Sequence, residues 1–236
     1  MHKSPVEASE YVASFWAAAE ALTPRADVAL CAPFVDLETL RIELAPSSVK
    51  FGAQDCYWEA EGAFTGEISA VMLKAIGVAY CIVGHSERRR LFNETDDMVA
   101  RKTSALLARE IVPIVCVGES LEEKQQGKTA ERVTAQVRAS VGHLTDDERA
   151  RIVIAYEPIW AIGSGLADDP ASANSCIRLI RETAGGLSDA RILYGGSMNA
   201  DNARAFCAQP DIDGGLVGSA SLDPRKFIQL IINSLK

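Results

Sequence analysis

The chain has 236 residues, of which 48% are hydrophobic and 24% are charged. This balance is typical of a folded globular domain and excludes disordered and collagen-like chains. The net charge of -8 and the absence of any basic run longer than Arg88-Arg89-Arg90 disfavour binding to a nucleic-acid backbone or an anionic membrane. No apolar stretch reaches the roughly 18 residues of a membrane helix and the N-terminus does not resemble a secretory signal, so we expect a cytoplasmic protein.

Short apolar runs rich in Val and Ile recur along the chain. They do not alternate between polar and apolar residues, which is typical of strands buried on both faces of a parallel sheet. Seven runs are predicted as strands, at 28–34, 49–57, 80–86, 112–120, 151–158, 190–197 and 212–221.

Helical patterns lie between these runs. Ser4-Pro5-Val6-Glu7 combines an N-cap, a proline at the first helical position and a capping-box glutamate. Similar start signals predict helices over 95–110, 171–184 and 225–235. Strand and helix alternate without a linker, which predicts a single α/β domain over 1–236 built from right-handed βαβ units.

The cysteines and histidines are scattered rather than clustered. No C-x-x-C motif occurs among the cysteines, and several of them lie inside apolar runs. We therefore expect reduced thiols that pack as small hydrophobic groups, and no metal site. The residues concerned are Cys31, Cys56, Cys81, Cys116, Cys176, Cys207, His2, His85 and His143.

The strand count leaves two architectures open. A doubly wound sheet can have seven strands, but it usually carries a Gly-rich nucleotide loop after its first strand, and none follows 28–34. A (β/α)8 TIM barrel typically needs about 250 residues, and this chain would be such a barrel without its first strand. The residues at the strand ends must decide between them.

Polar residues close most of the predicted strands. In a parallel barrel the loops that follow the strands build the functional site, so these side chains are its candidates. They are Asp55, His85, Glu119, Glu157, Ser197 and Ser219, and His85 and Glu157 are the natural acid–base pair.

His85 is followed directly by residues that can start a helical turn. The positive potential of a helix N-terminus disfavours an imidazolium ion and favours a neutral ring that donates a hydrogen bond. Glu157 closes an apolar strand, and a carboxylate removed from water there is suited to act as a general base. The alternatives are a histidine satisfied by local backbone and a glutamate paired with an arginine.

Two further loops carry functional signals. The apolar segment 159–165 contains two glycines, which suggests a lid that closes over a ligand. Glycine pairs before Ser197 and Ser219 let backbone N–H groups approach an anion, and a barrel often binds phosphate after its last two strands. Simple turns are the alternative interpretation of these glycines.

Several long motifs, in this order, resemble the triosephosphate isomerase family over the whole chain. They are GAQDCYWEAEGAFTGEIS (52–69), IVGHSERR (82–89), CVGESLEEKQQGKT (116–129), AYEPIWAIGSG (155–165), YGGSMNADNA (194–203) and DIDGGLVGSASL (211–222). The resemblance favours the TIM barrel, and it implies the interconversion of dihydroxyacetone phosphate and D-glyceraldehyde 3-phosphate in glycolysis and gluconeogenesis. It implies no metal and no organic cofactor.

The resemblance also implies roles for single residues. Glu157 would be the base, His85 the neutral electrophile that polarises the substrate carbonyl, and Glu87 the carboxylate that flanks the site. The phosphate would be held by Gly163, Ser197, Gly218 and Ser219.

A lid and a homodimer are implied in the same way. The lid and its hinges would comprise Pro158, Ile159, Trp160, Ala161, Ile162, Gly163, Ser164, Gly165, Leu166, Ala167 and Asp168. The dimer would form through the loop 57–67, in which aromatic side chains stand on a polar segment, an arrangement that itself favours an interface. Its expected interface residues are Tyr57, Trp58, Phe64 and Thr65.

Two departures from the family pattern stand out. The second hinge, often Lys-Thr-Ala in the family, reads Leu166-Ala167-Asp168. The family's first strand, with its Asn-x-Lys motif, is absent, because Met1–Pro5 corresponds to residues just after that lysine. Three hypotheses remain open: an active isomerase whose sequence begins late, a barrel relative that binds phosphate or a partner without efficient catalysis, and another phosphate-binding barrel isomerase or synthase.

Overall fold

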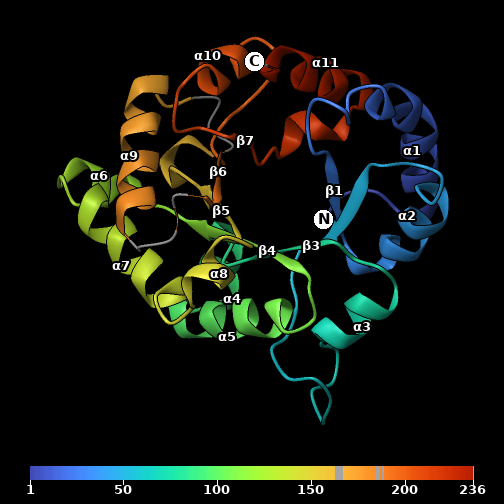
Figure 1. The fold of residues 1–236 in the computed structure, drawn as a ribbon, viewed down its shortest axis with the longest axis horizontal. Helices are drawn as coiled ribbons and strands as arrows, with labels where there is room; N and C mark the ends of the chain where they lie inside the picture. The colour runs from blue at the N-terminus through green and yellow to red at the C-terminus, as the bar shows by residue number, and fades with distance from the viewer. Residues whose placement is uncertain (163–166, 184–186, 188, 236) are drawn as a thin grey trace.

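The computed structural model describes residues 1–162, 167–183, 187 and 189–235. Its centre is a curled sheet of seven strands that pair in sequence order, each parallel to the next (Figure 1). The strands are β1 (Ala29–Ala32), β2 (Lys50–Ala53), β3 (Tyr80–Val83), β4 (Val112–Val117), β5 (Val153–Tyr156), β6 (Arg191–Tyr194) and β7 (Gly214–Gly215).

This strand order decides between the two predicted architectures. A doubly wound sheet reverses its strand order at a switch point, whereas this order runs without reversal from β1 to β7. The predicted TIM barrel with seven strands is therefore confirmed. Within the described residues β1 pairs only with β2 and β7 only with β6, so the two end strands face each other without a ladder.

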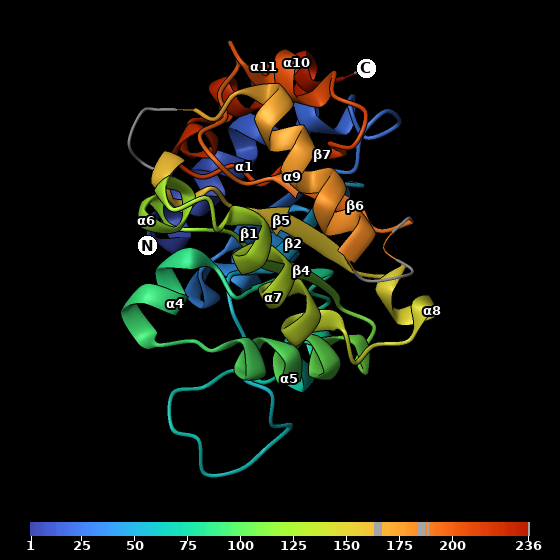
Figure 2. The same ribbon diagram turned by 90° about the vertical axis from the view of Figure 1, so that its left-hand side faces the viewer.

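Helices surround the sheet and cover its outer face (Figures 1 and 2). The α-helices are α1 (Pro5–Glu20), α2 (Leu37–Glu43), α3 (Ala70–Ala75), α4 (Ser86–Phe92), α5 (Asp96–Leu107), α6 (Leu121–Gln125), α7 (Thr129–Val141), α8 (Asp146–Arg149), α9 (Pro170–Thr183), α10 (Ala203–Cys207) and α11 (Pro224–Ser234). Short 3-10 helices are η1 (Phe34–Asp36), η2 (Ile159–Ala161) and η3 (Ser219–Leu222).

The predicted start signals work as helix caps. Ser4 and Glu7 form the expected capping box at α1, and the Thr95 hydroxyl accepts a hydrogen bond from the Met98 backbone N–H (3.2 Å) at α5. The Asp223 carboxylate accepts from two backbone N–H groups at the start of α11. Each cap satisfies donors that a helix N-terminus leaves without intrahelical partners.

Side chains from α1 and α11 pack together beside the two end strands. The Phe15 ring on α1 stacks against the Phe227 ring on α11 with centroids 5.5 Å apart, and the Tyr11 hydroxyl donates to the Ser221 carbonyl (2.8 Å). Most of the core lies between sheet and helices, and a smaller apolar cluster fills the barrel interior. The interior cluster consists of Ile82, Ile114, Cys116, Val153 and Ala155.

The six cysteines are free thiols, and all of them except Cys31 are buried. Burial raises the pKa of Cys176 to about 12. The part of the chain that the structure describes contains no cluster of three potential metal ligands. It also contains no helix long and apolar enough to cross a membrane.

Candidate active site

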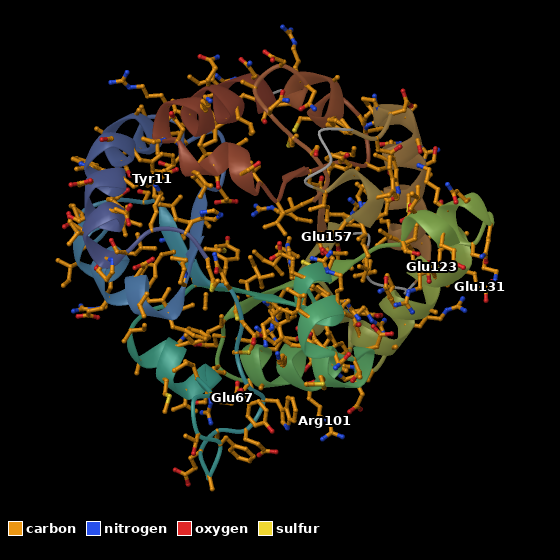
Figure 3. The ribbon with its side chains drawn as sticks, turned by 180° about the vertical axis from the view of Figure 1, so that it is seen from behind. Tyr11, Glu67, Arg101, Glu123, Glu131 and Glu157 are labelled. Carbon is orange, nitrogen blue, oxygen red and sulfur yellow. The ribbon has the colours of Figure 1, made fainter. Side chains whose placement is uncertain are left out.

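Glu157 lies just after β5, at the carboxyl end of the sheet, and its side chain is almost completely buried. One carboxylate oxygen, Oε1, lies 2.9 Å from His85 Nε2. The other oxygen, Oε2, accepts a hydrogen bond from the Ser86 backbone N–H (2.9 Å). Figure 3 shows Glu157 well inside the ring of helices, whereas Glu123 and Glu131 lie at the periphery. The two predicted acid–base residues are thus in direct contact.

The surroundings of His85 select its tautomer. His85 is the N-cap residue of α4, and its Nδ1 accepts a hydrogen bond from the Glu87 backbone N–H (3.3 Å). Since Nδ1 is an acceptor, the proton of the neutral ring resides on Nε2, which donates it toward Glu157. The helix N-terminus therefore orients the neutral imidazole as a hydrogen-bond donor.

The pKa of His85, however, moves in the direction opposite to the one that a helix N-terminus alone predicts. Burial acts to lower this pKa, but the hydrogen bond and the negative charge of Glu157, together with the Glu87 carboxylate, raise it above its ordinary value. The Glu87 carboxylate lies 3.9 Å from His85 Nδ1, and its side chain is largely exposed. The sequence could not show how closely the two carboxylates approach the ring.

Glycines let neighbouring strands approach the base closely. A Cβ atom at Gly118 would overlap the Glu157 carbonyl oxygen, and one at Gly195 would lie 3.0 Å from Glu157 Cγ. The Glu157 backbone N–H donates to the Val117 carbonyl (2.7 Å). Any side chain at Gly118 would displace the backbone of Glu157, so this position is part of the candidate site although the sequence reasoning did not single it out.

Ser86 and Arg89 are further residues that sequence reasoning missed. The Ser86 backbone N–H donates to the Glu157 carboxylate, and the place of Ser86 directly after His85 at a helix start was the available signal. Arg89 donates from Nε to the Gly84 carbonyl (2.6 Å) and from a terminal nitrogen to the Cys116 carbonyl (3.2 Å). Arg89 thereby ties the loop that carries His85 to β4, but nothing in the sequence indicated these backbone partners.

Asp55 and Glu119, the other acidic residues at strand ends, lie outside the His85–Glu157 pair. Asp55 belongs to a buried ion-pair network, with Oδ1 2.6 Å from Lys102 Nζ and Oδ2 2.8 Å from a terminal nitrogen of Arg88. Glu119 accepts hydrogen bonds from Tyr156 Oη and from Trp160 Nε1 (2.9 Å). Burial raises the pKa of both carboxyl groups. Their contacts are structural: Asp55 supports α4 and α5, and Glu119 holds the segment that follows the base.

The predicted phosphate loops follow β6 and β7. Ser197 Oγ donates to the Ala161 carbonyl (2.6 Å), which joins the loop after β6 to η2. Gly218 precedes η3, Ser219 begins it, and a Cβ at Gly218 would meet no atom within 4 Å. A short 3-10 helix therefore begins after the last strand, at Ser219, within the end of the predicted strand 212–221. Gly163 lies outside the described residues.

The predicted lid is described only at its two ends. Pro158 is the N-cap of η2, which comprises Ile159, Trp160 and Ala161, and Ile162 follows it. At the other end Asp168 is buried, and its backbone N–H donates to Tyr194 Oη (3.2 Å) just before α9. Ser164, Gly165 and Leu166 lie outside the described residues, and Ala167 is the first residue after them.

The loop 57–67 projects away from the barrel (Figures 1 and 2). Its aromatic rings cluster, with the Tyr57 centroid 4.0 Å from that of Trp58 and 4.8 Å from that of Phe64. Phe64 and Thr65 are exposed, and the Arg101 guanidinium lies 5.7 Å from the Trp58 ring centroid. The exposed Phe64 and the half-buried Tyr57 and Trp58 form an apolar cluster on this projecting loop.

These features together define a TIM-barrel protein whose candidate acid–base pair lies at the carboxyl ends of β3 and β5. The family model described as triosephosphate isomerase matches residues 1–234. The chain therefore belongs to the triosephosphate isomerase family.

Similar proteins of known name support the same assignment. The chain is 44% identical to "Triosephosphate isomerase" of Caldanaerobacter subterraneus subsp. tengcongensis, in an alignment that covers 98% of this chain and 95% of the relative. It is 45% identical to "Triosephosphate isomerase" of Roseiflexus sp. (98% and 93% covered) and 42% identical to that of Lactobacillus acidophilus (98% and 94% covered).

Proposed function

We propose that the chain is an isomerase that interconverts dihydroxyacetone phosphate and D-glyceraldehyde 3-phosphate. The observation that carries this proposal is the contact between Glu157 Oε1 and His85 Nε2 (2.9 Å), at the carboxyl end of a barrel in this family. A buried carboxylate can remove a proton from a substrate carbon, and an imidazole N–H beside it can donate a hydrogen bond to the adjacent carbonyl oxygen.

In the proposed mechanism, Glu157 and His85 act in two steps that are separated by an enediolate intermediate. The Glu157 carboxylate removes a proton from the carbon beside the substrate carbonyl, while the Nε2–H of His85 donates a hydrogen bond to the carbonyl oxygen. The carboxylic acid formed on Glu157 then returns the proton to the neighbouring carbon, while the hydroxyl proton passes from one oxygen of the enediolate to the other through Nε2 of His85, so that the new carbonyl and the new hydroxyl form together. Because the reaction moves protons within one molecule and leaves its overall oxidation state unchanged, the proposal requires no cofactor.

The phosphate group fixes the reacting carbons relative to the base. We assign it to Ser197, Gly218, Ser219 and Gly163, of which the first three are described and follow β6 and β7. The segment 158–168 begins at the residue after the base, and the Ser197–Ala161 hydrogen bond brings its described part to the phosphate loop. As a lid over the substrate, the segment 158–168 would exclude water from the enediolate.

The proposal extends to the assembly and its cellular location. The aromatic cluster of the loop 57–67, in which Phe64 is exposed and Tyr57 and Trp58 are half-buried, fits an interface with a second copy of the chain, and the exposed Thr65 follows Phe64. We place the enzyme in the cytoplasm, as expected for glycolysis and gluconeogenesis.

Replacement of the base tests the proposal. We expect Glu157→Gln to lower kcat by roughly 10²- to 10⁴-fold, because the amide cannot accept the substrate proton. Glu131→Gln, at an exposed position of α7, serves as the matched control and should leave kcat unchanged. The measurement is isomerisation of D-glyceraldehyde 3-phosphate by the purified proteins. Turnover by the unmodified chain that is no faster than that of Glu157→Gln would reject the proposal in favour of a phosphate-binding relative without efficient catalysis.

A further inference from the structure

Lys124, on α6, lies between the two described chain segments that flank residues 163–166. Its Nζ atom is 3.5 Å from the centroid of the Trp160 ring, in η2, and 3.5 Å from Oδ1 of Asp168, just before α9. One ammonium group thus contacts both segments. Asp168 is one of the hinge residues at which this chain departs from the family pattern.

Asp168 is held firmly on the α9 side. Its side chain is only 4% exposed, Oδ1 also accepts from the Asp169 backbone N–H (2.9 Å), and its own backbone N–H donates to Tyr194 Oη (3.2 Å). Ser172 Oγ lies 3.4 Å from Oδ2. A carboxylate buried in this way requires hydrogen bonds and a nearby positive charge, and Lys124 provides the charge.

Trp160, in the segment before residue 163, is held by two contacts. Its Nε1–H donates to Glu119 Oε1 (2.9 Å), while the Lys124 ammonium lies over its ring. Ammonium–indole attraction strengthens where water is partly excluded, and the Lys124 side chain is only 36% exposed. The neighbouring residue Ala161 accepts the hydrogen bond from Ser197, so the position of η2 is linked to the predicted phosphate loop.

We propose that Lys124 is a positioning residue that joins Trp160 to Asp168 and so keeps η2 against the loop that carries Ser197. The inference rests on the proposed function, because the advantage of this arrangement is binding of the substrate phosphate. Lys124 touches no reacting atom and acts through Trp160 and Asp168. When a binding-competent arrangement is populated less often, the apparent dissociation constant rises in proportion, while turnover at saturation changes little.

The first test replaces the charge while keeping the length of the side chain. We expect Lys124→Met to raise KM for D-glyceraldehyde 3-phosphate, and the dissociation constant of inorganic phosphate measured by calorimetry, about three- to tenfold with kcat within about twofold. Lys124→Arg retains both contacts and should restore both constants. Lys128→Met removes an exposed lysine at the N-cap of α7, four residues further along the chain, and should change neither constant.

A second variant tests the Asp168 side of the contact. Asp168→Asn should raise both constants less than Lys124→Met does, because the ammonium–indole contact remains. The double variant should show less than the product of the two single effects, since both substitutions remove the same ion pair. Multiplicative effects would reject the ion pair as part of the mechanism.

Fluorine NMR of protein labelled with 5-fluorotryptophan detects the contact between Lys124 and Trp160 independently of enzymatic activity. The chain has three tryptophans, so three resonances are expected, and Lys124→Met should shift the one from Trp160 whereas Lys128→Met should not. An unshifted Trp160 resonance, or unchanged phosphate affinity and KM in Lys124→Met, would overturn the inference. Lack of isomerisation by the unmodified chain would overturn the proposed function instead, and phosphate affinity and NMR would still decide the role of Lys124.

Discussion

The proposed chemistry depends on two side chains that lie 72 positions apart in the sequence and 2.9 Å apart in the fold. The strand ends bring them together, and local backbone sets their orientation: the Ser86 N–H holds one oxygen of Glu157, and the Glu87 N–H holds Nδ1 of His85. Each group therefore has one fixed contact and one contact that a substrate can replace. Such preorganisation lowers the cost of orienting the groups during the reaction.

The raised pKa of His85 makes the stability of the protein depend on pH. Because the folded state binds the His85 proton more tightly than the unfolded state, the stabilisation is complete below the unfolded pKa of about 6.5 and is lost as the pH rises through the folded pKa. We expect the difference in free energy of unfolding between the unmodified chain and His85→Gln to shrink as the pH rises above about 6.5. Urea unfolding at each pH measures this difference. A difference that stays constant or grows with pH would contradict the assigned direction.

Much of the site could be predicted at this scale, and the part that could not has a physical reason. His85 and Glu157 were found because polar residues at the ends of buried strands meet at one end of a barrel. The Ser86 contribution was missed because a backbone N–H makes it, and every residue type except proline has one. The Gly118 contribution was missed because it is the absence of a side chain close to Glu157, a residue 39 positions away in the sequence. The pKa direction of His85 depends on a distance between side chains that no spacing in the sequence fixes.

At the scale of elements, a buried ion-pair network joins the start of α4 to α5 below the loop that carries His85. Lys102 on α5 lies 2.6 Å from Asp55 and 2.8 Å from Glu94, and Arg88 on α4 also contacts both carboxylates. Burial alone would lower the pKa of Lys102, but the two carboxylates raise it above its ordinary value. The positive and negative charges of the four groups balance, so the loss of one member leaves an uncompensated charge.

Substitution within this network should be costly. We expect Lys102→Met to lower the free energy of unfolding by about 3–5 kcal/mol, because two buried carboxylates lose their shared cation. Lys74→Met removes the exposed ion pair of Lys74 with Glu110 and should cost no more than about 1 kcal/mol. Urea unfolding of both variants measures the contrast. Equal losses would show that the network contributes no more than a surface pair.

The predictability of the elements followed the strength of their local signals. All seven predicted strands are present, but the last shrinks from 212–221 to Gly214–Gly215, since the glycines that make a strand end flexible also shorten its ladder. The helix over Thr129–Val141 was not predicted. Its N-cap is Lys128, whose side chain makes no capping hydrogen bond, so the usual start signal is missing.

At the scale of the whole molecule, the projecting loop 57–67 presents a surface that a single barrel does not cover. Phe64 is 40% exposed although its ring contacts that of Tyr57, and residues 59–67 are all exposed to solvent. Exposed aromatic clusters of this kind are stabilised when a partner buries them.

A charge on this loop tests the proposed dimer. We expect the unmodified chain to sediment at twice its chain mass of 25.3 kDa, and Phe64→Glu at the mass of one chain, because a buried carboxylate without a partner opposes association. Val6→Glu adds the same charge at an exposed apolar position of α1 and should remain dimeric. A monomeric unmodified chain, or a dimeric Phe64→Glu variant, would contradict the dimer through this loop.

The positions of the free thiols around the barrel allow local opening of its different sectors to be followed by alkylation. Cys31, Cys81 and Cys116 lie on β1, β3 and β4, while Cys176 and Cys207 lie on α9 and α10, so most sectors of the ring contain a natural thiol reporter. A buried thiol reacts with an alkylating reagent only when its surroundings open, since burial hides the sulfur and raises its pKa. The order of alkylation, measured by mass spectrometry, would therefore rank the sectors by how readily each one opens locally. The half-buried Cys31, on the end strand β1, should react first.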